Sequence, residues 1–191
     1  MVERLTLNRF LKTFQTKEVL MGMDVVGRNP KNKNGEYFRA NVWSWRVIHH
    51  LNMVGVATYY SDTGYDDLIP EKTFEGMTFN DGKGLRSERK CNLLADRIEK
   101  FLEIEDGMFS ESWSLKLPTK GSFGRVEEIG VDEEKLFYID VGFYCDEEGK
   151  FLKEEDKNDS SIKKHSPYRT NESHLREWID FLRNCGGFRV W

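Results

Sequence analysis

The sequence predicts an α+β fold in which a mixed or mostly antiparallel sheet is packed by about three helices. Three observations support this prediction: segments with apolar residues at helical spacing, short apolar segments between them, and turns rich in glycine or asparagine. A chain of 191 residues is long enough to bury one sizeable core. We therefore expect a single compact domain over residues 21–191.

Residues 1–20 precede that domain and admit two interpretations. Apolar side chains spaced for one helical face predict a short amphipathic helix, and these are Leu7, Phe10, Leu11 and Phe14. Alternatively, the segment is a leader that does not belong to the native protein, because codons for Lys17-Glu18-Val19 can spell a bacterial ribosome-binding site. The native chain would then begin at Met21 or Met23, and its intact mass would show this.

The next segment combines a strand, a loop and a helix. Residues 21–26 are expected as a strand, and residues 27–35 as a loop because Pro30 lies among several glycines and asparagines. Asn41 is a suitable N-cap for a helix that ends at Gly55. The apolar face of this helix is expected to comprise Trp43, Val47, Ile48 and Leu51.

The middle of the chain is less regular. We expect a strand over residues 56–60, an acidic turn over 61–67, a short element over 74–79 and a strand over 113–117. Between the last two lies the strongest helical pattern, which extends to about residue 102 and carries charged residues opposite its apolar stripe. That stripe comprises Cys91, Leu94, Ala95, Ile98, Phe101 and Leu102.

The C-terminal third is predicted to hold the strongest strand and the last helix. Residues 136–145 are nearly all apolar, which predicts a central strand covered on both faces. The charge-rich segment 146–170 is expected to be a flexible loop or a long hairpin. Asn171 then caps a helix that ends before two glycines, and residues 188–191 form a closing strand. The apolar face of this helix comprises Leu175, Trp178, Ile179 and Leu182.

Composition and charge exclude several classes of protein. The formal net charge of −4 argues against a general nucleic-acid-binding protein that follows phosphates along one basic face. The chain has no run of about 18 apolar residues and no apolar signal core, which predicts a soluble cytoplasmic protein. Cys91, Cys145 and Cys185 stand far apart, so they are expected to be buried hydrophobic side chains and not zinc ligands.

Motifs for catalysis are missing. The glycine-rich loop at 80–84 does not match a Walker A motif, because Gly84 stands where that motif needs Ser or Thr. The four histidines show no metal-binding spacing, so no metal site is expected. Asp24 and Asp81 lie near expected strand or loop ends, where catalytic carboxylates are often found. A metal-dependent hydrolase or transferase that uses these two residues is therefore kept as an alternative.

The segment 22–51 concentrates arginine and tryptophan within an acidic chain. Arginine presents a planar fork to phosphate or carboxylate, and tryptophan presents a face for stacking. The loop at 80–84 adds N–H groups that can bind an anion before a helix. The opposing interpretation assigns the tryptophans to the core and the loop to a simple helix cap. The candidate ligand-binding residues are Arg28, Arg39, Trp43, Trp45, Arg46, Asn80, Asp81 and Gly82.

Residues 21–46, MGMDVVGRNPKNKNGEYFRANVWSWR, resemble the opening of a family of small bacterial and phage proteins. That opening has the pattern M-G-x-D-V-x-G-x-x-P followed by G-x-Y-F-R-x-N-x-W-x-W-R. Residues 80–85 and 176–188 also match the family, whereas Val47-Ile48 replace its Pro-Leu. The family has no established activity, so the resemblance implies a bacterial or phage origin and a start equivalent to Met21, but no mechanism.

These observations favour a non-enzymatic binding module for a small anionic or nucleotide-like ligand. In a phage, such a module would suit sequestering a host signalling nucleotide or blocking a host defence protein, by analogy alone. Besides the hydrolase or transferase, a protein–protein interaction module with an exposed aromatic patch is an alternative. The sequence does not indicate a cofactor, the identity of the ligand, or whether the chain forms a homo-oligomer.

Overall fold

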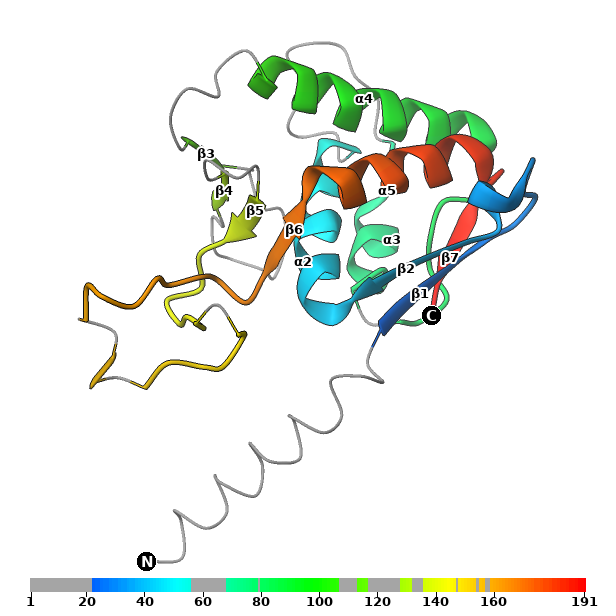
Figure 1. The fold of residues 1–191 in the computed structure, drawn as a ribbon. Helices are drawn as coiled ribbons and strands as arrows, with labels where there is room; N and C mark the ends of the chain where they lie inside the picture. The colour runs from blue at the N-terminus through cyan, green and yellow to red at the C-terminus, as the bar shows by residue number, and fades with distance from the viewer. Residues whose placement is uncertain are drawn as a thin grey trace, which may run out of the picture.

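The computed structural model describes residues 22–55, 68–78, 80–106, 113–116, 128–131, 136–146, 148–153, 155–156 and 159–191. The helix expected over 1–20, the strand expected over 56–60 and the turn expected over 61–67 lie outside these residues. The described chain has an α+β fold, as predicted, with two antiparallel sheets and several helices (Figure 1).

The first sheet has three strands in the order β2-β1-β7, and both pairs are antiparallel. Its strands are β1 (Gly22–Gly27), β2 (Tyr37–Asn41) and β7 (Phe188–Val190). The expected first and last strands are confirmed, whereas β2 comes in addition to the expected elements. Successive side chains alternate between the two faces of a sheet. The buried face comprises Met23, Val25, Phe38, Ala40, Phe188 and Val190.

The second sheet has four strands in the order β3-β4-β5-β6, again antiparallel throughout. Its strands are β3 (Trp113–Lys116), β4 (Glu128–Val131), β5 (Leu136–Ile139) and β6 (Arg169–Asn171). The strand expected over 113–117 is confirmed by β3, and β5 does lie between two other strands.

The strand expected over 136–145 is nevertheless wrong in length and in burial. β5 ends at Ile139, because the Asp140 carboxylate accepts a hydrogen bond from the N–H of Gly142 at 2.9 Å and the chain turns. Gly142 has φ +74°, a conformation that residues with a side chain rarely adopt. Within β5 only Phe137 and Ile139 are buried, so the strand has one covered face.

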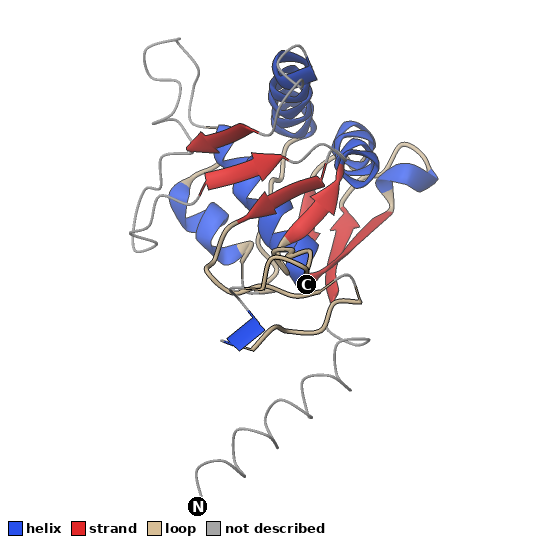
Figure 2. Cartoon of the chain, turned by 60° about the vertical axis from the view of Figure 1, so that its left-hand side comes forward, coloured by secondary structure: helices blue, strands red, loops and turns tan. Residues whose placement is uncertain are grey.

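The α-helices of the described chain are α2 (Val42–Leu51), α3 (Glu71–Gly76), α4 (Glu88–Asp106) and α5 (Glu172–Asn184), with 3₁₀ turns η1 (Lys33–Gly35) and η2 (Asn52–Gly55). The predicted caps are confirmed, because the side chains of Asn41 and Asn171 accept hydrogen bonds from first-turn N–H groups. α2 lies between the two sheets, and α4 and α5 run side by side (Figure 1). Figure 2 shows α4 and α5 nearly end-on, next to one another.

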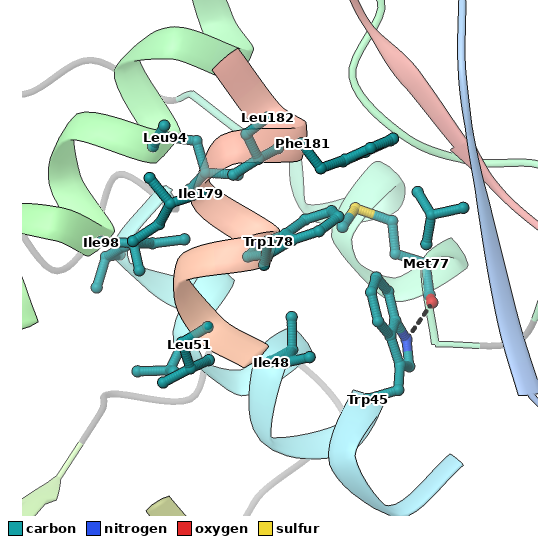
Figure 3. Packing of buried hydrophobic residues seen from close by; sticks show 14 of the residues in the cluster. Trp45, Ile48, Leu51, Met77, Leu94, Ile98, Trp178, Ile179, Phe181 and Leu182 are labelled. Carbon is teal, nitrogen blue, oxygen red and sulfur yellow. Dashed lines mark hydrogen bonds between the residues drawn. The ribbon is translucent and has the colours of Figure 1, made fainter. Parts of the chain in front are cut away.

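Trp178 of α5 lies near the centre of a hydrophobic core that is shared by both sheets (Figure 3). Its ring contacts four other aromatic rings at centroid distances of 5.0–5.6 Å. The apolar stripes expected for α4 and α5 are buried in this core, as are all three cysteines. The second sheet contributes Ile129, Phe137 and Ile139.

The charge-rich segment 146–170 makes backbone contacts where it is described. Cys145 forms isolated bridges with Phe151 and with His165, and the N–H of Leu152 donates to the Tyr144 carbonyl at 2.9 Å. The segment thereby returns to the second sheet before β6 begins. Among the helices that the structure describes, none combines the length and the apolar character that crossing a membrane requires.

Candidate functional site

The starts of α2 and α5 are built in the same way. Each helix follows an aromatic residue, an arginine, a small residue and an asparagine: Phe38-Arg39-Ala40-Asn41 before α2 and Tyr168-Arg169-Thr170-Asn171 before α5. Because side chains alternate along a strand, the arginine and the asparagine lie on the same side of each strand. Each helix start therefore carries an arginine close to its cap.

These two helix starts border one pocket with a volume of about 680 Å³, a size typical of small-molecule sites. Guanidinium, amide and hydroxyl groups predominate among the side chains that surround it. The lining residues are Gly22, Arg39, Asn41, Ser44, Arg169, Thr170, Asn171, Ser173, His174 and Glu177.

Two arginines and two helix N-termini make the pocket electropositive. Each N-terminus is equivalent to about half a positive charge. No hydrogen bond or ion pair joins the Arg169 side chain to another residue that the structure describes. The Arg39 guanidinium lies 3.8 Å from the Asp24 carboxylate, and both side chains are largely exposed, so this pairing holds Arg39 only weakly. Glu177 is the acidic residue of the lining, and its carboxylate lies 3.2 Å from the His174 ring.

Thr170 has an unsatisfied hydroxyl group on the core side of β6, opposite the side that carries Arg169 and Asn171. The residue is 5% exposed, and its hydroxyl oxygen has no hydrogen-bond partner among the described residues. Leaving a buried hydroxyl group unpaired costs about 1–3 kcal/mol, so such groups are uncommon in folded proteins. The Arg169 side chain faces the pocket, whereas the Thr170 hydroxyl group is enclosed by the protein.

Of the predicted ligand-binding residues, Arg39 lines this pocket and Trp45 lies in the core. Trp45 is 3% exposed, and its indole N–H donates to the Met77 carbonyl at 3.1 Å (Figure 3). The expectation that Trp45 faces a ligand is therefore not met, because the rotation of α2 turns this side chain inward.

Trp43 and Arg46 lie around the ring of Tyr168. The half-buried Trp43 ring packs 5.0 Å from the Tyr168 ring and 5.9 Å from the Phe151 ring, measured between centroids. The guanidinium carbon of Arg46 lies 4.5 Å from the Tyr168 centroid, which is a cation–π contact. Both residues attach the segment before β6 to α2, and neither lines the pocket.

Arg28 lies away from the pocket. Gly22 borders the pocket, and Arg28 follows the other end of β1, roughly 20 Å along an extended chain. Its Nε donates to the Phe188 carbonyl at 3.2 Å. Burial, followed by the nearby charges of Arg189 and Arg86, lowers the pKa of Arg28 from its usual value.

In the loop at residues 80–82, Asp81 and Gly82 form hydrogen bonds within the protein. Asn80 has φ +54°, and the N–H of Gly82 donates to the Val190 carbonyl at 2.9 Å. A Cβ atom at Gly82 would lie 3.3 Å from the Trp191 ring, so this ring covers the glycine. The Asp81 carboxylate accepts a hydrogen bond from the N–H of Lys83 at 3.1 Å. These residues do not line the pocket.

The two carboxylates of the hydrolase or transferase alternative have local partners. Asp24 accepts a hydrogen bond from the Tyr37 hydroxyl group, which raises the pKa of Tyr37, whereas Asp81 caps its own loop. Neither residue lines the pocket. Over the described ranges, no group of three or more His, Cys, Asp or Glu residues is arranged to hold a metal ion.

Sequence reasoning missed the α5 half of the pocket. The charge-rich composition of 146–170 predicts a loop, which obscures the arginine near its end. The signal that could have identified both halves is the repeated order of aromatic, arginine, small residue and asparagine before a helix. The missed residues are Arg169, Thr170, Asn171, Ser173, His174 and Glu177.

Comparisons of this chain with protein-family models, with curated proteins and with solved structures found no match. No relative therefore supplies a ligand, a reaction or a mode of assembly.

Proposed function

We propose that this protein is a non-enzymatic binding module for a small anionic, nucleotide-like ligand held between the starts of α2 and α5. The observation that carries the proposal is the convergence of Arg39, Arg169 and two helix N-termini on one pocket. Phosphate is the anion that best suits this arrangement, because guanidinium groups and first-turn N–H groups both donate to its oxygens.

The two helix starts are expected to act differently on the ligand. Asn171 accepts a hydrogen bond from the N–H of His174, and the other first-turn N–H groups of α5 have no acceptor within the helix. Those groups can donate to an anion directly. Asn41 already accepts from the N–H groups of Trp43 and Ser44, so α2 is expected to contribute mainly through its dipole.

The residues that line the pocket favour ligand binding without catalysis. Asp24 and Asp81, the candidate catalytic carboxylates, do not line the pocket. The Ser44 hydroxyl group, a candidate nucleophile, bonds to the Asn41 side chain at 3.1 Å and not to a base. An anion held here would meet donors and positive charge, with no activated nucleophile among these named groups.

Replacing Arg169 with Gln is expected to weaken binding of adenosine 5′-monophosphate about 10- to 100-fold. A hydrogen bond to a charged group contributes about 1.5–3 kcal/mol, which corresponds to that range of dissociation constants. Isothermal titration calorimetry measures the effect directly. Arg39→Gln is expected to weaken binding in the same direction.

The matched control is Arg189→Gln, which removes the same charge from an exposed residue of β7 that does not line the pocket. Its affinity for the nucleotide should equal that of the unchanged protein. If all three variants bind equally well, or if neither the nucleotide nor inorganic phosphate binds the unchanged protein, the proposal is wrong.

Replacing Thr170 with Val tests the unsatisfied hydroxyl group. Valine has nearly the same shape, so the free energy of unfolding without ligand should stay the same or rise by up to about 1 kcal/mol, because an unpaired buried polar group disappears. Nucleotide affinity should stay the same, because this hydroxyl group is enclosed by the protein and out of reach of a ligand in the pocket. Urea unfolding and calorimetry measure the two effects. A folded variant that binds the nucleotide clearly more weakly would contradict this placement of the hydroxyl group.

A further inference from the structure

A second cavity lies beside Arg169. Its volume is about 400 Å³, and it opens along the second sheet and the end of the charge-rich segment. The residues that line it are Leu136, Tyr138, Asp140, Tyr144, Lys163, Lys164, His165, Ser166 and Arg169. Arg169 thus belongs to the linings of both cavities.

The register of the sheet explains why these side chains meet. Arg169 of β6 pairs directly with Tyr138 of β5, so their side chains lie on the same face. Leu136 and Asp140 lie two residues to either side of Tyr138 and share that face. A Cβ atom at Gly130 would lie 2.3 Å from the Tyr138 ring, so this glycine leaves the space in which the ring rests on β4.

Among the described residues that line the second cavity, positive charges outnumber negative ones. The cationic side chains are Lys163, Lys164 and Arg169, and the carboxylate is that of Asp140. The Asp140 carboxylate already accepts hydrogen bonds from the Tyr144 hydroxyl group at 3.1 and 3.2 Å and from the N–H of Gly142. The chain as a whole has a net charge of −4, so the sign of the charge around these two neighbouring cavities is opposite to that of the whole protein.

We propose that the second cavity is a second phosphate subsite, and that the two cavities together take one small molecule with two separated phosphate groups. A dinucleotide or a nucleoside bisphosphate has this chemistry. This inference rests on the proposed function and deepens it. Arg169 lies between the two phosphate groups, where its several donors can serve both.

Two features favour a nucleotide over a simple dicarboxylate. Tyr138 and Tyr144 line the second cavity, and a tyrosine ring offers a face on which a base can stack. The first pocket alone, at about 680 Å³, already has the size of a drug-sized ligand site. A dicarboxylate could pair with the cationic side chains, but it would not contact the two tyrosine rings and would leave much of the first pocket empty.

The test compares three probes by calorimetry: adenosine 5′-monophosphate, adenosine 3′,5′-bisphosphate and the 5′-phosphorylated dinucleotide pApA. The unchanged protein should bind at least one of the two bisphosphorylated probes about tenfold or more tightly than the monophosphate. Whichever of the two binds more tightly identifies the nucleoside bisphosphate or the dinucleotide as the better fit.

Lys163→Gln together with Lys164→Gln should remove this advantage and leave the affinity for the monophosphate unchanged, whereas Arg169→Gln should weaken binding of all three probes. The matched control is Lys150→Gln with Lys153→Gln, which removes equal charge from the same segment outside both cavities and should change nothing. Circular dichroism checks that each variant is folded.

The possible results distinguish a failure of the second subsite from a failure of the proposed function. If the three probes bind equally, or if the advantage survives in the Lys163 and Lys164 variant, the second subsite is disproved while the first pocket stands. If none of the probes binds, the proposed function fails and the second subsite fails with it.

Discussion

Replacing Trp178 with Ala should lower the free energy of unfolding by about 3–5 kcal/mol, the largest single effect that we expect in this protein. The side chain is fully buried, and its ring packs against Phe38, Trp45, Phe181 and Phe188. Removing it leaves a cavity between α5 and the first sheet that rigid neighbouring rings cannot fill. Denaturant unfolding of the purified variant measures the loss.

Trp178→Phe separates the packing of the ring from its hydrogen bond. The indole N–H donates to the Asn52 side-chain oxygen at 3.1 Å, and the other end of that buried amide, Nδ2, has no partner among the described residues. Phenylalanine keeps most of the ring contacts but removes the donor, so we expect a loss of about 1–3 kcal/mol. Equal losses for the Phe and Ala variants would contradict the assignment of the larger effect to packing.

The second large effect is a loss of stability as the pH falls from about 6.5 to about 4, caused by His49. Burial is the main reason that the pKa of this imidazole falls from 6.5 to about 4, and the positive charges of His50 and Arg46 add to it. The hydrogen bond to the Phe74 carbonyl at 2.8 Å works in the opposite direction. Because a carbonyl group only accepts, Nε2 carries the proton of the neutral ring.

The direction of this pH effect follows from the pKa values of His49 in the unfolded and the folded chain. Between pH 6.5 and 4 the unfolded chain binds a proton at His49 that the folded chain does not, so acid favours unfolding. The stabilisation is complete above pH 6.5 and is lost progressively down to pH 4, where the loss reaches about 3 kcal/mol. Urea unfolding at several pH values between 4 and 8 measures this profile.

His49→Gln is the control, because glutamine can donate to the same carbonyl and does not titrate in this range. Subtracting its pH profile from that of the unchanged protein isolates the histidine from the carboxylates that titrate in the same window. A difference that stays flat from pH 8 to pH 4 would show that His49 is protonated in the folded protein with a nearly normal pKa.

Helices were the part of the fold that local sequence patterns predicted well. The apolar stripe of α4 and the face of α5 follow helical spacing, and both appear buried where the spacing places them. The caps Asn41 and Asn171 act on N–H groups two or three residues away. Because these interactions join residues that are close in the sequence, the identities of neighbouring residues are enough to predict them.

Strand length and burial were harder to predict, as β5 shows. Its sequence remains nearly all apolar to Cys145, yet the strand stops at Ile139 because a short turn at Asp140 and Gly142 intervenes. Trp45 illustrates the same difficulty on a helix. Its position among arginines suggested a ligand contact, but the packing of α2 on α3 decided that this ring is buried.

For the candidate site, too, local sequence patterns identified one part and missed another. The unusual local composition of residues 22–51 marks Arg39 as a candidate, whereas Arg169 lies far along the chain in a charge-rich segment. Their shared pocket exists only because α2 packs against β6 and α5 packs against β2. The repeated order of aromatic, arginine, small residue and asparagine marks both helix starts, but it does not show that the two starts border one pocket.

The sequence by itself determined the α+β class, the positions and caps of the main helices, and the faces that they bury. Periodicity and capping follow from the geometry of neighbouring residues, so they can be read along the chain. Only the tertiary structure decided that there are two sheets, that Trp45 belongs to the core, and that Arg39 and Arg169 line one pocket. Strand pairing and pocket formation depend on contacts between segments that are distant in the sequence. The free energy of such a contact depends on both segments, so it cannot be predicted from either one alone.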